Sequence, residues 1–224
     1  MVKKLIKYFL VTVLALITLV VVGPWALYLY GLQALPSDTS PTNGNIPPVV
    51  LQALWISETN TTTMLMKPVS IWDWVIMFIT AHPEDFTPSF RVAGLTARVL
   101  VSRDPIIKPQ RLFKRQVREL AVAIWVNQHW TAEEALRTIL AGSYFGHGFY
   151  GLSNAAQGYF GLPTRELSIG EAAVLTGLIR APSRYDPWCQ PERSRAFVEA
   201  LVAKLKTGIN LSPRLLPPPA GACN

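Results

Sequence analysis

Apolar side chains recur at helical spacing through the second half of the chain. Between residues 111 and 129 they follow the 3.6-residue period of one helix face, at Leu112, Phe113, Val117, Leu120, Ala121, Ile124 and Trp125. Residues 131–134 (TAEE) then have the arrangement of a capping box and predict a helix that runs to about Ala141.

Two further helices are predicted beyond a glycine-rich loop. Ser153 begins a short one that Gly161 ends, because glycine is common just after a helix. Residues 168–171 (SIGE) form a second capping box, and the apolar run that follows predicts a helix as far as Pro182.

The first half of the chain has shorter predicted helices. One opens at residues 47–48 (PP) and ends near Glu58, and an apolar one follows residues 70–73 (SIWD), which resemble a capping box with a shorter acid. Another is predicted over residues 88–101. No segment alternates convincingly between apolar and polar positions, so the predicted fold class is mainly α.

The N-terminal segment is apolar for the length of a membrane span. No charged residue occurs between Tyr8 and Ser37, and about 20 apolar residues are enough for a helix to cross a bilayer. Residues 8–30 are therefore predicted as a transmembrane anchor, preceded by a cytoplasmic N-terminus, residues 1–7, that contains lysines. A signal peptide cleaved near Ala34 is the rival interpretation, although its apolar region would be shorter.

Charge and cysteine content set mild limits on the remaining chain. The net charge of +7 includes the three N-terminal lysines, and the mildly basic remainder suits an anionic membrane surface or ligand better than nucleic acid. Cys189 and Cys223 could pair in an oxidising compartment, but two unpaired surface thiols are the preferred interpretation. Residues 31–45 are predicted as a polar linker and the proline-rich residues 209–224 as a disordered tail.

Four motifs follow one another between residues 144 and 187. They read YFG-x-G-x-YG, AA-x-x-YFG, L-x-x-x-EAA-x-L-x-GL and APS-x-Y-x-P. Their residues are Tyr144-Phe145-Gly146, Gly148, Tyr150-Gly151, Ala155-Ala156, Tyr159-Phe160-Gly161, Leu167, Glu171-Ala172-Ala173, Leu175, Gly177-Leu178, Ala181-Pro182-Ser183, Tyr185 and Pro187. With these motifs, the region resembles glycosyltransferase family 51, the peptidoglycan glycosyltransferases found alone or attached to penicillin-binding proteins.

This resemblance implies a lysozyme-like α-helical domain, assigned here to residues 46–208. In the family the glycine- and aromatic-rich block packs the lobe beside the cleft, so Tyr144, Phe145, Tyr159 and Phe160 are expected to be largely buried. Family members polymerise lipid II by moving the growing glycan from undecaprenyl pyrophosphate to the 4-hydroxyl of an acceptor sugar. The chain length and one anchor also resemble the monofunctional members.

The resemblance implies two catalytic acids. The family carries a base in E-D-x-x-F, after a helix that reads L-P-P-x-x-x-x-A-x-x-x-x-E, and residues 46–58 match this lead-in so that Glu58 falls on the base. Glu119 falls on the glutamate of the family's R-K-x-x-E motif. An ordinary salt bridge between Arg115 and Glu119, four positions apart on a helix, explains that pair equally well.

Cationic residues are the expected ligands of the departing pyrophosphate. Arg98 takes the place of a family lysine, and Lys114 and Arg115 lie at the R-K-x-x-E motif, so these three are the candidate anion binders. A larger basic set is predicted as a solvated face or a contact to lipid phosphates: Arg103, Lys108, Arg111, Lys114, Arg115 and Arg118.

The N-terminal half departs from the family pattern. Thr59 replaces the aspartate after the base, and residues 88–95 keep none of the polar character of the family's G-G-S-T-I-T-Q-Q motif. The predicted function is thus a membrane-anchored peptidoglycan glycosyltransferase, with a non-catalytic relative that binds glycan, lipid II or wall-synthesis proteins as the alternative. The Glu84-Asp85 pair within HPEDF is interpreted as an exposed turn.

The expected partners are lipid II, the nascent glycan strand and the membrane, with other cell-wall synthesis proteins left open and no nucleic acid. The expected location is the bacterial inner membrane, in a single pass with the domain on the periplasmic or outer side. His129 and His147 have no metal-ligand spacing to another histidine, cysteine or acid, so no metal centre is predicted. A divalent cation at the pyrophosphate is the one cofactor that the resemblance leaves open.

Overall fold

The computed structural model describes residues 2–33, 35, 39–42, 44–80, 87–103, 112–205 and 213–223. These residues form helices and one isolated antiparallel bridge, Tyr144–Tyr150, without any strand, so the predicted mainly α fold class is confirmed. The elements are α1 (Val2–Leu32), α2 (Pro48–Thr59), α3 (Ile71–Thr80), α4 (Pro88–Arg103), α5 (Leu112–His129), α6 (Ala132–Gly142), α7 (Leu152–Phe160), the 3-10 turn η2 (Thr164–Glu166), α8 (Ile169–Arg180) and α9 (Pro191–Leu205).

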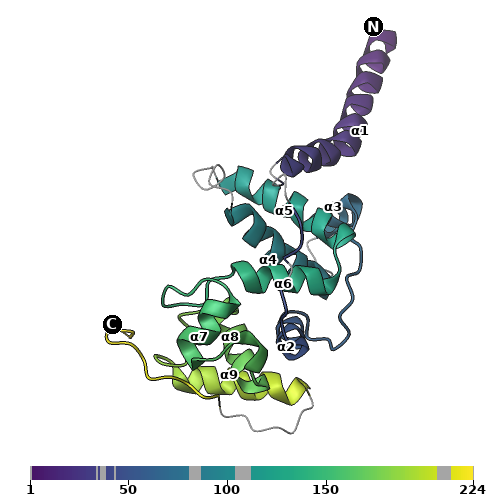
Figure 1. Ribbon diagram of the computed structural model, residues 1–224. Helices are drawn as coiled ribbons and strands as arrows, with labels where there is room; N and C mark the ends of the chain where they lie inside the picture. The colour runs from purple at the N-terminus through teal and green to yellow at the C-terminus, as the bar shows by residue number, and fades with distance from the viewer. Residues whose placement is uncertain are drawn as a thin grey trace.

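The helices form two neighbouring groups. Figure 1 shows α1 projecting from one end beside α5, with α7, α8 and α9 gathered at the opposite end. Helix α4 packs against both α5 and α6, and α2 joins the groups because it contacts α4 and α6 as well as α8 and α9. Every residue of α8 from Ile169 to Leu178 is buried, so the EAA-x-L-x-GL motif supplies a central core helix.

The local signals in the sequence account for most helix starts. In residues 131–134 and 168–171 the side chains of the first and fourth residues exchange hydrogen bonds with each other's backbone N–H groups, so both predicted capping boxes are confirmed. Residues 70–73 make the same pair of contacts with aspartate as the acid. The patterns gave no helix for residues 191–205, where the structure has α9.

Helix α1 extends beyond both ends of the predicted anchor. It is the helix in the described part of the chain that is long and apolar enough to cross a membrane, by length and composition. Pro24 lies inside the helix, and Figure 1 shows α1 changing direction along its length. A proline explains such a bend because it removes one backbone donor and crowds the preceding turn.

The last turn of α1 packs tightly on α5 at Gly31. A Cβ atom at this position would lie 2.3 Å from the Ala121 Cβ and 2.9 Å from the Val117 carbonyl oxygen, which is too close for any side chain. Glycine at position 31 thus allows the two helices to touch, and this contact positions the anchor against the domain.

Replacing Gly31 by alanine is expected to push α1 away from α5 and to cost about 1–3 kcal/mol, as other overpacked contacts do. The measurement is thermal unfolding of the full chain in detergent micelles. Gly23→Ala is the matched control, because its Cβ would meet only the Leu19 Cδ1 at 4.0 Å. Equal melting temperatures for the two variants would contradict the tight contact.

The glycine- and aromatic-rich block is largely core. Phe145, Tyr159 and Phe160 are buried as expected, whereas Tyr144 is 42% exposed, so its predicted burial was wrong. Tyr144 instead lies beside Tyr150 on the outside of the loop, with ring centroids 4.8 Å apart.

One glycine of the block, Gly158, shows why the sequence has no side chain there. A Cβ at Gly158 would lie 2.3–2.7 Å from three atoms of the Phe149 ring. The ring is therefore packed directly on the backbone of α7, and the glycines and aromatic residues of this block act together as packing partners.

The C-terminal segment required two corrections. Cys189 and Cys223 form a disulfide, so the preferred interpretation as unpaired surface thiols was wrong. Residues 213–223, which had been predicted as part of a disordered tail, follow a defined course along the domain. Leu216 donates its N–H to the Tyr159 carbonyl oxygen and accepts a hydrogen bond from the Trp188 indole N–H. Short-range composition could not reveal these contacts, because their partners are far away in the sequence.

Candidate active site

Glu58 lies in the last turn of α2, where the helix packs against α4 and α8. The residue is 9% exposed. Burial raises the pKa of the Glu58 carboxyl above its usual range, and the positive charges of Arg180 and Arg91 oppose part of this rise. A buried carboxylate that feels the charges of two arginines is an uncommon arrangement for a purely structural helix end.

Such a carboxylate is suited to accept a proton. A base with a raised pKa binds the abstracted proton more strongly than an exposed carboxylate does, while the nearby cations keep a fraction of it ionised. Buried groups of this kind mark candidate functional sites, since burying a charge costs stability unless it is paired. The geometry is therefore consistent with the role predicted for Glu58, which stays a prediction.

A groove of about 500 Å³ runs between α4 and α5. It is lined by Phe90, Arg91, Gly94, Leu95, Arg98, Gln116, Glu119, Leu120 and Ala123. Two residues predicted from the sequence, Arg98 and Glu119, thus line the same groove although they come from different helices. Glu58 is not among the lining residues, so the structure does not place the two predicted acids side by side.

Arg91 connects Glu58 with the groove. Its charge acts on the Glu58 carboxyl, and its side chain lines the groove that contains Arg98 and Glu119. Residue-by-residue comparison with family motifs missed Arg91, because it falls in the stretch that has lost the family pattern. The spacing between Arg91 and Arg98 could have indicated its role, since the two residues are two helical turns apart and share a face of α4.

Arg180 was also missed by the sequence reasoning. It is the basic residue in the last turn of α8, directly before the APS-x-Y-x-P motif. The carbonyl groups at a helix C-terminus favour a cation there, which is a sufficient local reason for an arginine. Its effect on Glu58 depends on the packing of α2 against α8, and no pattern within α8 reveals that contact.

The remaining predicted cations lie at the edge of this region. The Arg115 Nε is 2.7 Å from the Glu119 Oε1, and the Arg115 side chain is half-exposed. This is the i,i+4 salt bridge that the sequence allowed, and such exposed pairs contribute about 0–1 kcal/mol. Lys114 is exposed and is not among the lining residues of the groove.

Other members of the basic set have separate places. Arg118 lies with its guanidinium carbon 5.9 Å from the ring centroid of Tyr30, so it contacts the end of α1. Lys108 and Arg111 lie outside the described residues, as do Glu84 and Asp85 of the HPEDF stretch.

The residues that line the groove decide whether it could hold a divalent cation. Magnesium and calcium are held chiefly by carboxylate and carbonyl oxygens. Among the described residues that line the groove, Glu119 is the one carboxylate; it is paired with Arg115, and Arg91 and Arg98 add positive charge. This donor set does not fit a divalent cation, whereas its guanidinium groups are suited to an anion.

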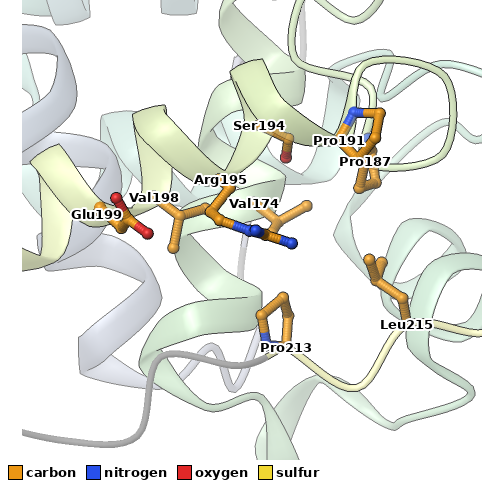
Figure 2. Close-up of a pocket in the computed structure, with 9 residues that line it drawn as sticks. All are labelled: Val174, Pro187, Pro191, Ser194, Arg195, Val198, Glu199, Pro213 and Leu215. Carbon is orange, nitrogen blue, oxygen red and sulfur yellow. The ribbon is translucent and has the colours of Figure 1, made fainter.

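A second cavity, of about 270 Å³, lies at the other end of the domain between α8, α9 and the C-terminal segment. Figure 2 shows the Arg195 guanidinium reaching between Val174 and Pro213, with Leu215 at the side of the opening. No residue predicted to take part in catalysis lines this cavity. The cavity is therefore separate from the α4–α5 groove.

Comparison with known proteins finds the same family. The family model for transglycosylases matches residues 96–206, just under half of the chain. Penicillin-binding protein 1A of Pseudomonas aeruginosa is 35% identical over 104 residues, which cover 46% of this chain and 13% of that protein. Penicillin-binding protein 1A of Mycobacterium tuberculosis is 39% identical over 82 residues, covering 37% of this chain and 10% of the relative. Penicillin-binding protein 1A of Escherichia coli is 32% identical over 105 residues, which cover 47% of this chain and 12% of that protein.

The match is to one region of much longer proteins, since the aligned part spans 10–13% of the length of these three relatives. It includes Arg98, Glu119, α8 with its EAA motif and all of α9, and it begins after Glu58 and Arg91. The matched region, together with the helical architecture and the four consecutive motifs, supports a transglycosylase domain of glycosyltransferase family 51 in this chain.

Proposed function

We propose that this protein is a membrane-anchored peptidoglycan glycosyltransferase that polymerises lipid II into glycan strands. The observation that supports this most directly is the connection between Glu58 and the α4–α5 groove through Arg91. The charge of Arg91 acts on the Glu58 carboxyl, whose pKa is raised, and the same side chain lines a groove whose guanidinium groups suit an anion. Transfer of a sugar from a pyrophosphate carrier needs both a base and a site for the leaving anion.

In the proposed reaction the acceptor's 4-hydroxyl oxygen attacks the anomeric carbon of the donor sugar. Glu58 takes the hydroxyl proton as the new carbon–oxygen bond forms, and the bond from the anomeric carbon to the pyrophosphate oxygen breaks. The electron pair of that bond leaves with the pyrophosphate, and Arg91 and Arg98 stabilise its negative charge. Glu119 holds Arg115 at the groove edge and thereby helps to position the cations.

A non-catalytic role is the second candidate, and one observation favours it. The family match begins at residue 96 and leaves out Glu58, together with the stretch that has lost the family's polar cleft motif. A chain that retained the groove without the base would still bind lipid-linked or polymerised glycan through Arg91 and Arg98.

Polymerisation of labelled lipid II by the purified full chain in detergent distinguishes the two functions. A glycosyltransferase yields glycan strands that are resolved by gel electrophoresis, and lysozyme digests them. A binding relative yields no polymer but retains lipid II, measured by fluorescence anisotropy. A chain that neither polymerises nor binds lipid II would contradict both functions.

The proposed location is the cytoplasmic membrane, with the domain on its outer side. Helix α1 is long enough to span the bilayer, and Lys3, Lys4 and Lys7 precede its apolar part. Lysines next to a span favour retention of that end in the cytoplasm.

A reporter fused after Asn224 is accordingly expected to behave as an exported protein. An alkaline phosphatase fusion should be active and a green fluorescent protein fusion dark, because the former needs export to become active. The opposite pattern would reverse the orientation, and an N-terminus at about residue 35 in the mature protein would show a cleaved signal peptide instead of an anchor.

A further inference from the structure

Three potential metal ligands meet beneath the C-terminal segment, at the opposite end of the domain from the groove. One ligand atom each from His147, Asp186 and Cys189 lies within 4.8 Å of the other two. The His147 Nε2 is 2.6 Å from the Asp186 Oδ2, and the two side chains are only 16% and 9% exposed. The proposed glycosyl transfer uses none of these residues.

The histidine and the aspartate are held in fixed orientations. The Asp186 Oδ1 accepts hydrogen bonds from the backbone N–H groups of Trp188 and Cys189, at 2.9 and 3.2 Å, which leaves Oδ2 to face His147. The His147 ring packs 5.0 Å from the Trp188 ring, between centroids. A carboxylate whose second oxygen is bound by the protein is the usual arrangement of a metal ligand, because outer contacts orient the inner ones.

The backbone of His147 adds an independent sign of constraint. Its φ is +48°, in the left-handed region that residues other than glycine seldom adopt. Such a conformation persists where the surrounding structure fixes it, and it is common at functional sites. Here it accompanies the placement of the imidazole against Asp186.

Cys223 lies next to these three residues, because it forms the disulfide with Cys189. Its segment is also held by contacts that do not depend on the disulfide. Leu216 bonds through its backbone to Tyr159 and Trp188, and the Arg214 Nε is 3.3 Å from a carboxylate oxygen of the buried Glu171. Opening the disulfide therefore leaves Cys223 close to Cys189.

We propose that, in the reduced chain, Cys189 and Cys223 join His147 and Asp186 to form a four-ligand zinc site. A dithiol reductant opens the disulfide by thiol–disulfide exchange: the reductant becomes a disulfide and the protein gains two thiols. Zinc then displaces the two thiol protons and binds both thiolates, the neutral His147 imidazole and the Asp186 carboxylate. In this state zinc replaces the disulfide as the link between residues 213–223 and the domain.

The ligand set and spacing suit zinc in particular. Tetrahedral zinc takes sulfur, nitrogen and oxygen ligands at about 2.0–2.3 Å, so neighbouring ligand atoms are about 3–4 Å apart. The ligand atoms of His147, Asp186 and Cys189 already lie within 4.8 Å of one another, and the Cys223 sulfur is bonded to that of Cys189, so a small adjustment reaches this geometry. Local spacing could not reveal this site, because Asp186 is 39 positions from His147.

The test uses the full chain in detergent micelles, reduced with a dithiol and desalted without oxygen. Titration with cobalt(II) should give thiolate-to-cobalt absorption that saturates at one equivalent, and zinc should displace the cobalt. The oxidised chain should bind neither metal at the same concentrations. His147→Gln and Asp186→Asn should each weaken zinc binding by about 10-fold or more, measured by competition with a chromophoric chelator.

His129→Gln is the matched control, since this histidine lies on α5 and should leave zinc binding unchanged. Zinc-edge X-ray absorption of the reduced wild-type chain needs no variant and should show two sulfur ligands and imidazole scattering. A reduced chain that binds no zinc would overturn the proposal. So would binding that His147→Gln and Asp186→Asn leave unchanged, or a spectrum without imidazole.

Discussion

Replacing Glu58 by glutamine is expected to lower the rate of lipid II polymerisation by about 10²-fold or more, the usual contribution of a positioned general base. Glutamine keeps the size of the side chain but cannot accept the proton of the acceptor hydroxyl. The measurement is the initial rate of glycan formation by the full chain at saturating lipid II. Glu166→Gln is the matched control, because this side chain is half-exposed on η2.

The pH dependence gives a second readout of the same residue. Because burial raises the pKa of Glu58, the wild-type rate should begin to fall at a higher pH than it would with an exposed glutamate as base. The fall occurs on the acid side, where Glu58 becomes protonated and cannot act as a base. The residual activity of Glu58→Gln should lack this acid limb.

The stability of Glu58→Gln separates a catalytic effect from misfolding. A raised pKa means that the folded chain binds the proton more tightly than the unfolded chain, so this group makes the fold less stable as the pH rises from acid to neutral. Glutamine has no such proton to lose, so the variant should be at least as stable as the wild type at neutral pH. Full polymerisation by a stable Glu58→Gln variant would refute the assignment of the base.

The fold could be predicted where the sequence carries local instructions. The capping boxes at residues 131–134 and 168–171 depend on side chains three positions apart, and both form as expected. The buried Phe145, Tyr159 and Phe160 followed from one contiguous motif. In each case the interacting groups are close in sequence or belong to a pattern that is specific to one family.

Contacts between distant segments could not be predicted in this way. The effect of Arg180 on Glu58 depends on the packing of α2 against α8, and the pairing of Cys189 with Cys223 depends on the course of residues 213–223. Helix α9 was not predicted, although its apolar positions Phe197, Val198, Leu201 and Val202 have helical spacing.

The candidate site contains residues that the sequence predicted and one that it did not. Family resemblance found Arg98 and Glu119, which line one groove, but it missed Arg91 in the neighbouring stretch where the family pattern is lost. A physical criterion would have found it, because cations two turns apart lie on the same face of a helix whatever motif surrounds them. For divergent relatives, such spacing is a useful complement to motif matching.

Replacing Phe160 by alanine is expected to destabilise the domain by about 3–5 kcal/mol, as for other buried phenylalanines. Phe160 is 4% exposed at the end of α7, and its ring centroid lies 6.1 Å from that of the buried Tyr159. The substitution removes a buried ring and leaves a cavity that the neighbouring helices fill only in part. In thermal unfolding each kcal/mol lowers the midpoint by about 2–4 °C in a domain of this size, so the shift should be large.

Tyr144→Ala provides the comparison within the same block. Tyr144 is 42% exposed and contacts Tyr150 at 4.8 Å between ring centroids, so its truncation should cost about 1 kcal/mol. If Phe160 belongs to the core and Tyr144 to the surface, the two melting temperatures must differ clearly, with Phe160→Ala the lower. Similar shifts would mean that the aromatic block is not a packing unit, and that its exposed ring contributes as much to stability as the buried one.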